Sequence, residues 1–430
     1  MLTRVVLETL TPEERRALTG RSAMPDRAVM EGAAAIVDAV CAGGDAALAE
    51  AGREHGGGRR EGALVSKDEQ RAALAKLPRP VRIALERAIE SVTAFHRVQI
   101  PADVAVETTP GVVVERRWSP LHRVAAYVPG GLAAYPSTLV MTVVPARLAG
   151  VGEIVVASPA GPDGVMAQAL LAAASLLEID ELYAMGGAQA VAALAHGTET
   201  IRQVGKIVGP GNTWVTAAKL HVLGVCAIDM PAGPSEVCVL ADRASDPRLV
   251  AVDLLCQAEH GPDSPAVLVT ADPGLADRVD AEIERLLALL DRSEILERAI
   301  SDHGMAVIAA DHHQAVAFAE EYAGEHITIL TTDPETDSKA ITSAGSVYVG
   351  RWSPESAGDY ATGANHVLPT GGLAAAYGPL SVEDFGSWRQ VQTLTEAGLR
   401  RLWPTIAVLA DAEGLTAHRL AAELRFEDKS

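Results

Sequence analysis

A glutamine and a histidine stand three residues apart in the segment CQAEHGP at 256–262. A helical pattern leads into this segment and Gly261 and Pro262 end it, so Gln257 and His260 are expected on one face of the last helical turn. An amide oxygen and an imidazole at this spacing suit a divalent metal ion. The alternative is a surface glutamine beside a histidine that the helix dipole favours, and the spacing alone prefers this alternative.

A carboxylate and an imidazole are adjacent in Glu325–His326, directly before the apolar run at 327–330. Histidine titrates near neutrality and a neighbouring charge tunes its pKa, so the pair is suited to supply two general bases. A solvated loop is the alternative, and the sequence spacing does not separate the two.

Several glycine-rich loops carry side chains that bind ligands. The longest, at 358–372, contains Asp359, Asn365, His366 and four glycines. Long segments without regular structure in compact domains usually have a function, and glycine lets a ligand approach the backbone. Shorter Gly/Pro loops with hydroxyl or amide groups lie at 127–138, 209–212 and 233–236, and such loops at strand ends indicate a small-molecule site.

The elements that must hold these loops alternate between two patterns. Short β-branched runs such as 153–157, 236–240 and 266–270 are separated by alanine- and leucine-rich helical runs. This alternation predicts parallel strands covered on both faces, in two doubly wound α/β units. Helices are also predicted at 27–41 and 67–98. G-x-G-x-x-G does not follow a strand, so the usual Rossmann fingerprint would not hold a dinucleotide here.

Composition excludes several classes of protein. The chain has 36 Lys and Arg against 56 Asp and Glu, a formal net charge of −20 that repels nucleic acid and anionic lipid. The longest apolar runs are too short to cross a bilayer, and a secretion signal is not visible. We therefore predict a cytoplasmic protein that binds neither nucleic acid nor membranes. The cysteines have no disulfide or redox spacing.

Taken together, these segments resemble the histidinol dehydrogenase family over about residues 20–425, and chance does not supply so many matches in order. The resemblance is carried by YVPGG at 127–131, YPST at 135–138, GGAQA at 186–190, KIVGPGN at 206–212, IDMPAGPSEV at 228–237, QAEHGPD at 257–263, GDYATGANHVLPTGG at 358–372 and LTAH at 415–418.

The resemblance implies an NAD-linked, zinc-dependent, four-electron oxidation of L-histidinol through L-histidinaldehyde to L-histidine, the last step of histidine biosynthesis. His326 would take the hydroxyl proton and Glu325 would activate the water that attacks the aldehyde. The implied ligands of one zinc ion are Gln257, His260, Asp359 and His418. The implied substrate contacts are Ser235, Gln257, His260, His326, Asp359, Glu413, His418 and His366, with Ser137 as a further contact. The implied NAD contacts are Tyr127, Gln189 and Asn212.

The resemblance also implies a fold of two incomplete Rossmann-like α/β domains with small helical extensions. It implies a homodimer whose tails are exchanged, so that Glu413 and His418 reach the site of the other subunit. We expect an N-terminal extension at 1–24, an α/β domain with the metal and base residues at 25–125 plus 235–380, an α/β domain with the nucleotide loops at 126–234, and a helical tail at 381–430.

The sequence departs from the family pattern in one loop and at two tryptophans. The loop at 53–62 is rich in glycine and arginine, and Trp352 and Trp388 are unexpected, so changes in packing near the substrate loop and in substrate choice are anticipated.

Three alternative functions are open. The first is that of a paralogue of the same fold, which would oxidise another small alcohol, such as dihydroxypropane sulfonate. A solute-binding protein would need no paired bases, and a catalytically inactive paralogue would not retain an intact zinc set.

Overall fold

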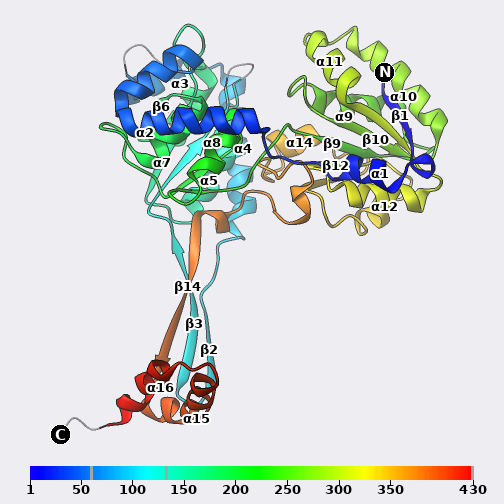
Figure 1. Ribbon diagram of the computed structural model, residues 1–430. Coiled ribbons are helices and arrows are strands. Elements are labelled where there is room, and N and C mark those ends of the chain that lie inside the picture. The colour runs from blue at the N-terminus through cyan, green and yellow to red at the C-terminus, as the bar shows by residue number, and fades with distance from the viewer. Residues whose placement is uncertain (59–61, 131–133, 428–430) are drawn as a thin grey trace.

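Two separate parallel sheets form the frame of the molecule, and a long antiparallel ribbon extends away from them (Figure 1). The computed structural model describes residues 1–58, 62–130 and 134–427. Gly131 of the YVPGG segment and residues 59–61 of the glycine- and arginine-rich loop lie outside the described residues. The α/β class with parallel sheets that the sequence predicts is confirmed.

The six-stranded sheet has the order β1–β11–β10–β9–β12–β13, and all its strands are parallel. Successive strand residues face opposite sides, so Val237 and Val239 pack under α9 while Cys238 and Leu240 pack under α12. The strands are β1 (Thr3–Val6), β9 (Val237–Leu240), β10 (Ala266–Thr270), β11 (Gly304–Ile308), β12 (His326–Ile329) and β13 (Ser346–Val349). The helices around this sheet are η1 (Leu7–Thr9), α1 (Pro12–Thr19), α9 (Pro247–Ala258), α10 (Pro273–Leu287), α11 (Ser293–His303), α12 (His312–Tyr322), α13 (Pro334–Ser338) and α14 (Glu355–Tyr360).

The first residues of the chain belong to this sheet. Strand β1 pairs with β11, with Thr3 opposite Met305. The expected helical extension at 1–24 is therefore wrong for β1 and matches only α1, whose start is fixed by a capping box between Thr11 and Glu14.

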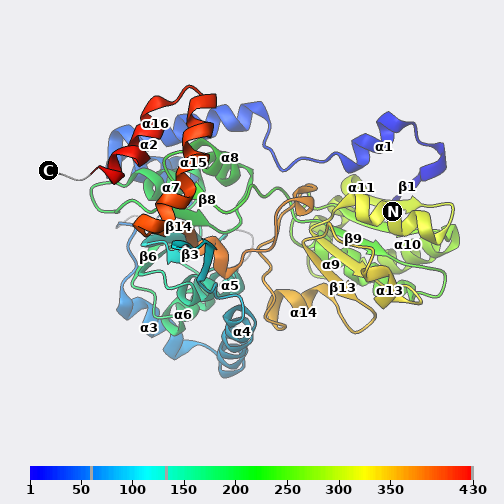
Figure 2. The ribbon, with the colours of Figure 1, turned by 90° about the horizontal axis from the view of Figure 1, so that it is seen from below.

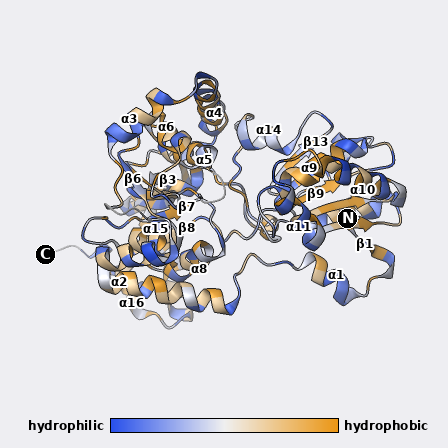
Figure 3. Cartoon of the chain, turned by 90° about the horizontal axis from the view of Figure 1, so that it is seen from above, coloured by the Kyte–Doolittle hydropathy of each residue, from blue (hydrophilic) through white to orange (hydrophobic). Residues whose placement is uncertain are grey.

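The five-stranded sheet has the order β6–β5–β4–β7–β8, again with every strand parallel. Its strands are β4 (Arg123–Tyr127), β5 (Glu153–Ser158), β6 (Glu181–Ala184), β7 (Lys206–Val208) and β8 (Ala227–Ile228). The covering helices are α5 (Pro136–Leu148) and α6 (Gln168–Leu176) on one face and α7 (Gly187–His196) and α8 (Thr213–Val222) on the other. Helices α5 and α7 are themselves apolar and buried over nearly all of their length, and Figure 3 shows much hydrophobic colour in this part of the chain.

The N-terminal helices pack on this second sheet, which corrects the expected grouping of 25–125 with 235–380. Helix α2 (Arg27–His55) packs against α7 and α8, α3 (Lys67–Lys76) against α6, and α4 (Arg79–Arg97) against α5. Buried apolar residues of these helices join the cores of the five-stranded sheet. The single helix predicted at 67–98 is broken because Leu77, which precedes Pro78, is extended.

By length and composition, α2 is apolar enough to cross a membrane, although the apolar runs of the sequence predicted no such segment. Its buried side chains Ala33, Val37 and Val40 contact the core under α7 and α8. The helix is also bent at Gly44, whose φ of 56° and ψ of −140° are not helical. We therefore interpret α2 as a helix that covers this core with one face and leaves its other faces accessible.

The ribbon carries the C-terminal helices at its far end (Figures 1 and 2). It has the order β14–β3–β2 and consists of β2 (Val104–Thr109), β3 (Val112–Pro120) and β14 (Gly386–Leu394). The tail is α15 (Glu396–Ala412), α16 (Thr416–Glu423) and η4 (Leu424–Phe426). The strand β14 was not expected in the helical tail at 381–430. The remaining short elements are η2 (Leu373–Ala375) and η3 (Val382–Phe385).

Candidate functional site

A cleft of about 540 Å³ lies between the two sheets and collects residues from both. On the five-stranded sheet its lining follows the carboxyl ends of β4 and β7, as expected for an open α/β sheet. On the six-stranded sheet its lining precedes β9, β10 and β12, at their amino ends. Nine of the residues singled out in the sequence line this cleft: Tyr127, Ser137, Asn212, Ser235, His260, Glu325, His326, Asp359 and His366.

The adjacent carboxylate and imidazole are both buried at the amino end of β12. Nδ1 of His326 lies 3.2 Å from the main-chain oxygen of Glu236, whereas its Nε2 has no hydrogen-bond partner among the described residues. If Nδ1 carries the proton and donates a hydrogen bond to that oxygen, Nε2 is the unprotonated nitrogen, on a residue that lines the cleft. Oε2 of Glu325 accepts a hydrogen bond of 2.9 Å from the main-chain N–H of Glu236.

Burial shifts the two groups in opposite directions. It lowers the pKa of His326 to about 3, with His260 and His366 acting in the same direction. It raises the pKa of Glu325 well above its ordinary value, against the hydrogen bond from Glu236. The imidazole therefore stays neutral and able to accept a proton, while the carboxyl group ionises only at higher pH.

Three ligand atoms of His260, Glu355 and Asp359 lie within 4.8 Å of one another. The amide of Gln257, one turn before His260, is fully buried, and neither its oxygen nor its nitrogen has a partner in the part of the chain that the structure describes. A buried polar group without a partner is costly, so this arrangement points to a ligand that these atoms bind. Imidazole nitrogen with amide and carboxylate oxygens is a donor set that Zn²⁺ accepts.

Glu355 is the residue of this cluster that the sequence reasoning missed. It begins α14, is fully buried, and both its carboxylate oxygens lack partners among the described residues. Burial raises its pKa well above the ordinary value, and burial also raises the pKa of Asp359 to about 6. The available signal was the spacing of four residues between Glu355 and Asp359, which places both on one face of a helix.

The long glycine-rich loop is pinned by Asn365. Its Nδ2 donates to the main-chain oxygen of Met141 at 2.8 Å, and its Oδ1 accepts from Val367 N at 3.0 Å. His366 is thereby held with Nδ1 3.0 Å from the main-chain oxygen of Asp359 and Nε2 3.1 Å from Oγ1 of Thr138. The loop thus places His366 beside Asp359 of α14 on the cleft wall, and the segment predicted as irregular at 358–372 is helical at its start.

The three residues assigned to NAD have different surroundings. The hydroxyl of Tyr127 accepts from Gly187 N at 3.1 Å, and the side chain of Asn212 caps α8 by accepting from Val215 N at 3.1 Å. Gln189 is buried, donates to the main-chain oxygen of Gly56 at 3.2 Å, and does not line the cleft. The altered loop at 53–62 therefore contacts this part of the molecule.

Glu413 and His418 are not brought to the cleft of their own chain. Glu413 follows α15 and His418 lies in α16, at the far end of the ribbon, and both are exposed (Figure 1). The two unexpected tryptophans also lie outside the cleft lining. Trp388 packs edge-on against Trp118 across the ribbon, and Trp352 is exposed.

Comparison with known proteins gives a consistent result. A family model described as histidinol dehydrogenase matches residues 19–426. The chain is similar to the histidinol dehydrogenase of Vibrio cholerae, with 43% identity over 98% of each chain. It is also similar to that of Methanothermobacter thermautotrophicus, with 44% identity over 91% of this chain and 92% of the relative. Among solved structures, the histidinol dehydrogenase of Elizabethkingia anophelis matches with a TM-score of 0.92 and 36% identity, covering 99% of this chain and 98% of the other.

Proposed function

The chain belongs to the histidinol dehydrogenase family, NAD-dependent enzymes that oxidise histidinol to histidine in histidine biosynthesis, and we propose that the cleft between its two sheets is where this reaction takes place. The observation that carries the proposal is the buried pair Glu325–His326, whose free Nε2 belongs to a residue that lines the cleft. Beside this pair lie the buried side chains of Gln257 and Glu355, whose polar atoms could bind a metal ion and also lack hydrogen-bond partners among the described residues.

We propose different roles for the two bases. His326 takes the hydroxyl proton of L-histidinol through Nε2 as hydride leaves the carbinol carbon. Glu325 then removes a proton from the water that attacks L-histidinaldehyde, and the hydrate gives up the second hydride. NAD, when bound, accepts a hydride in each oxidation. A neutral imidazole and a carboxyl group with a raised pKa suit two successive proton removals from groups of different acidity.

We propose that Gln257, His260 and Asp359 hold one zinc ion, with Glu355 beside them. The orphaned amide of Gln257 and the closeness of His260 to Asp359 support this assignment. The ion, when bound, would supply a positively charged anchor for the substrate's imidazole and amine. Substrate contacts are proposed for Ser235, His366 and Ser137, all of which line the cleft. NAD contacts are proposed for Tyr127, Asn212 and Gln189.

We propose that the enzyme is a homodimer with exchanged tails, in which the partner subunit's Glu413 and His418 complete the cleft. The ribbon supports this proposal because it holds both residues far from the cleft of their own chain (Figure 1). The tail also exposes apolar side chains that a second copy would cover: Val408, Leu409, Leu415, Leu420 and Leu424. A cytoplasmic location is part of the proposal, since the family is one of soluble biosynthetic enzymes.

The experiment that tests the proposed function measures NADH and L-histidine together from L-histidinol and NAD, with and without a chelator. We expect about two NADH for each histidine, because the oxidation removes four electrons and each NAD takes two. Chelation should abolish turnover and Zn²⁺ should restore it. A dimeric, zinc-loaded sample that does not turn over histidinol would contradict the proposal, and other small alcohols would then be tried as substrates.

A further inference from the structure

Glu236 lies behind the catalytic pair and outside the cleft. It directly precedes β9, its side chain is buried, and it is not among the residues that line the cleft. The family resemblance assigns a role to its neighbour Ser235 and none to Glu236. Its contacts nevertheless reach both proposed bases.

Glu236 and Glu325 hold each other's backbone. The main-chain N–H of Glu236 donates to Oε2 of Glu325 at 2.9 Å, and the main-chain N–H of Glu325 donates to Oε1 of Glu236 at 3.3 Å. The main-chain oxygen of Glu236 lies 3.3 Å from the main-chain nitrogen of His326 and 3.2 Å from its Nδ1. The rotamer of Glu325 and the tautomer of His326 therefore both depend on the position of Glu236.

The carboxylate of Glu236 is itself held by Arg21. One guanidinium nitrogen of Arg21 donates to Oε2 of Glu236 and the other donates to the main-chain oxygen of Tyr322. The guanidinium carbon also lies 3.4 Å from the centre of the Tyr322 ring. A planar fork that pairs with a carboxylate and stacks on an aromatic ring fixes direction as well as charge, which lysine does not reproduce.

Glu236 also joins the segments in which the chain passes from one sheet to the other. Among the described residues, the segments that connect elements of one sheet to elements of the other are 20–26, 229–236 and 361–372. Oε1 of Glu236 accepts from Gly371 N at 3.1 Å, and Thr370 Oγ1 accepts from Gly233 N at 2.6 Å. A Cβ on Gly371 would lie 2.7 Å from Ala23 N, so the first and third segments are in tight contact.

We propose that Glu236, held by Arg21, is a positioning residue that sets the geometry of Glu325 and His326 against the junction between the two sheets. This inference rests on the proposed roles of the two bases. The charged carboxylate accepts hydrogen bonds from Arg21, Glu325 and Gly371 at once, and charge-assisted hydrogen bonds are stronger than neutral ones. Loss of the charge or of Arg21 loosens this arrangement while leaving every atom that touches substrate in the protein.

The test compares E236Q and R21M with the unmodified enzyme, using histidinol and histidinaldehyde as separate substrates. We expect kcat to fall roughly 10- to 100-fold in both oxidations, since misplacement by an ångström costs up to about that much. KM for histidinol should change less than about threefold, because the substrate contacts are intact. The double variant R21M/E236Q should lose little more than either single variant, because both act through one pair.

The matched control is R15M. Arg15 in α1 pairs with Glu321 in α12 at 2.5 Å, so it anchors the same N-terminal segment without reaching Glu236. We expect R15M to retain kcat. An equal fall in R15M would overturn the proposal, because the effect would then come from anchoring the segment. Unchanged kcat in folded E236Q would also overturn it.

If E236Q and R21M fail to fold, R21K tests the proposal instead, because lysine keeps the positive charge at position 21 and lacks the planar guanidinium group. Folded R21K with reduced kcat and unchanged KM supports the proposal, and R21K with normal kcat contradicts it. Failure of the proposed function is distinguishable, because it would appear as absent histidinol oxidation in the unmodified enzyme.

Discussion

At the scale of single residues, the cleft is marked by polar groups that burial leaves without partners. Burial removes three such groups from water, and the described part of the chain offers them no hydrogen bond in exchange: the Gln257 amide, the Glu355 carboxylate and Nε2 of His326. The spacing of Gln257–His260 and of Glu325–His326 made both pairs candidates, but it favoured a surface glutamine for the first and did not exclude a solvated loop for the second, so only the family resemblance gave them roles. The sequence did not predict Glu355, since the packing of α14 against α9 brings that residue beside His260 and depends on contacts distant in the sequence.

The variant H260A should lose zinc while its sheets stay folded, because His260 follows α9 and is not part of either apolar core. Removing one of few protein ligands should reduce the zinc affinity by at least about 100-fold. Zinc content after dialysis and far-UV circular dichroism would be measured together. H313A is the control, since His313 is exposed on α12. Full zinc content in H260A would contradict the ligand assignment.

The two oxidations should respond differently to acid. The pKa of His326 is lowered to about 3, so its imidazole remains an acceptor at any pH above that value. The pKa of Glu325 is raised, so its carboxyl group is protonated and inactive as a base below that raised pKa. Acidification should therefore slow histidinaldehyde oxidation at a higher pH than histidinol oxidation. Initial rates of NADH formation from each substrate across a pH series test this, and coincident profiles would refute it.

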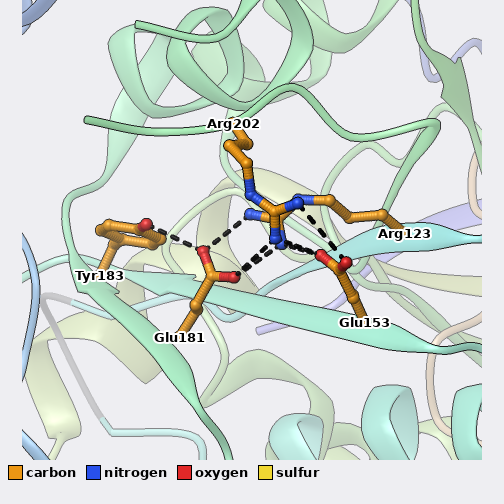
Figure 4. A network of polar contacts seen from close by, with 5 residues as sticks. All are labelled: Arg123, Glu153, Glu181, Tyr183 and Arg202. Carbon is orange, nitrogen blue, oxygen red and sulfur yellow. Dashed lines mark hydrogen bonds and ion pairs between the residues drawn. The ribbon is translucent and has the colours of Figure 1, made fainter. Parts of the chain in front are cut away.

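At the scale of elements, a polar network joins the amino ends of three neighbouring strands at one edge of the five-stranded sheet, at the end opposite the cleft (Figure 4). Arg123 of β4 pairs with Glu153 of β5 at 2.6 Å and with Glu181 of β6 at 2.7 Å, and Tyr183 donates to Glu181 at 3.0 Å. Arg123 is buried, so removing a partner leaves a buried charge undercompensated. The network holds three neighbouring parallel strands in register.

The variant E181Q should be less stable than the unmodified protein by roughly 1–2 kcal/mol at neutral pH, a value reduced for the partial exposure of Glu181. Arg123 lowers the pKa of Glu181 from its ordinary 4.5 to about 2. The stabilisation is therefore complete above about pH 4.5 and is lost as the pH falls toward 2. Urea unfolding of both proteins along this range should show the difference shrinking with acid.

The control for this prediction is E115Q. Glu115 pairs with Arg117 at 2.6 Å on the ribbon surface, where such a pair contributes less than about 1 kcal/mol. A loss in E115Q equal to that in E181Q, or a difference for E181Q that does not depend on pH, would argue against the network.

Local pattern predicted the parallel strands well, because β-branched runs such as Val237–Leu240 are short, apolar and bounded by turns. It failed for β1 and β14, whose exposed faces carry polar residues and whose partners lie far away in the sequence. It also misplaced α2, since an apolar helix face does not say which of two similar α/β cores will cover it. Such choices are made by tertiary packing.

At the scale of the whole molecule, the ribbon separates the tail from the cleft of the same chain. The nine-residue pairing of β14 with β3, from Gly386 opposite Pro120 to Leu394 opposite Val112, gives the ribbon its length. In the proposed dimer with exchanged tails, this length would carry Glu413 and His418 to the cleft of another copy. The motif LTAH by itself names residue types, and it was the family resemblance that implied their use by another subunit.

Mixing two inactive variants tests the exchange of tails directly. In a shared site, E325Q disables the cleft of its own subunit, while H418A disables the cleft of its partner. A mixed dimer then keeps one intact cleft, formed by Glu325 of the H418A chain and His418 of the E325Q chain. Co-refolded in equal amounts, the variants should recover about a quarter of the normal activity, because about half of the dimers are mixed and half of their sites are intact.

The matched mixture is E325Q with H326A. Each of these substitutions disables the cleft of the chain that carries it, so both sites of a mixed dimer are defective. We expect it to recover no activity. If each cleft were instead completed by its own tail, E325Q with H418A would also recover none, because every chain would carry one defect in its only site. Recovery in the first mixture alone therefore requires His418 to act across the dimer, and absence of recovery would contradict the exchange of tails.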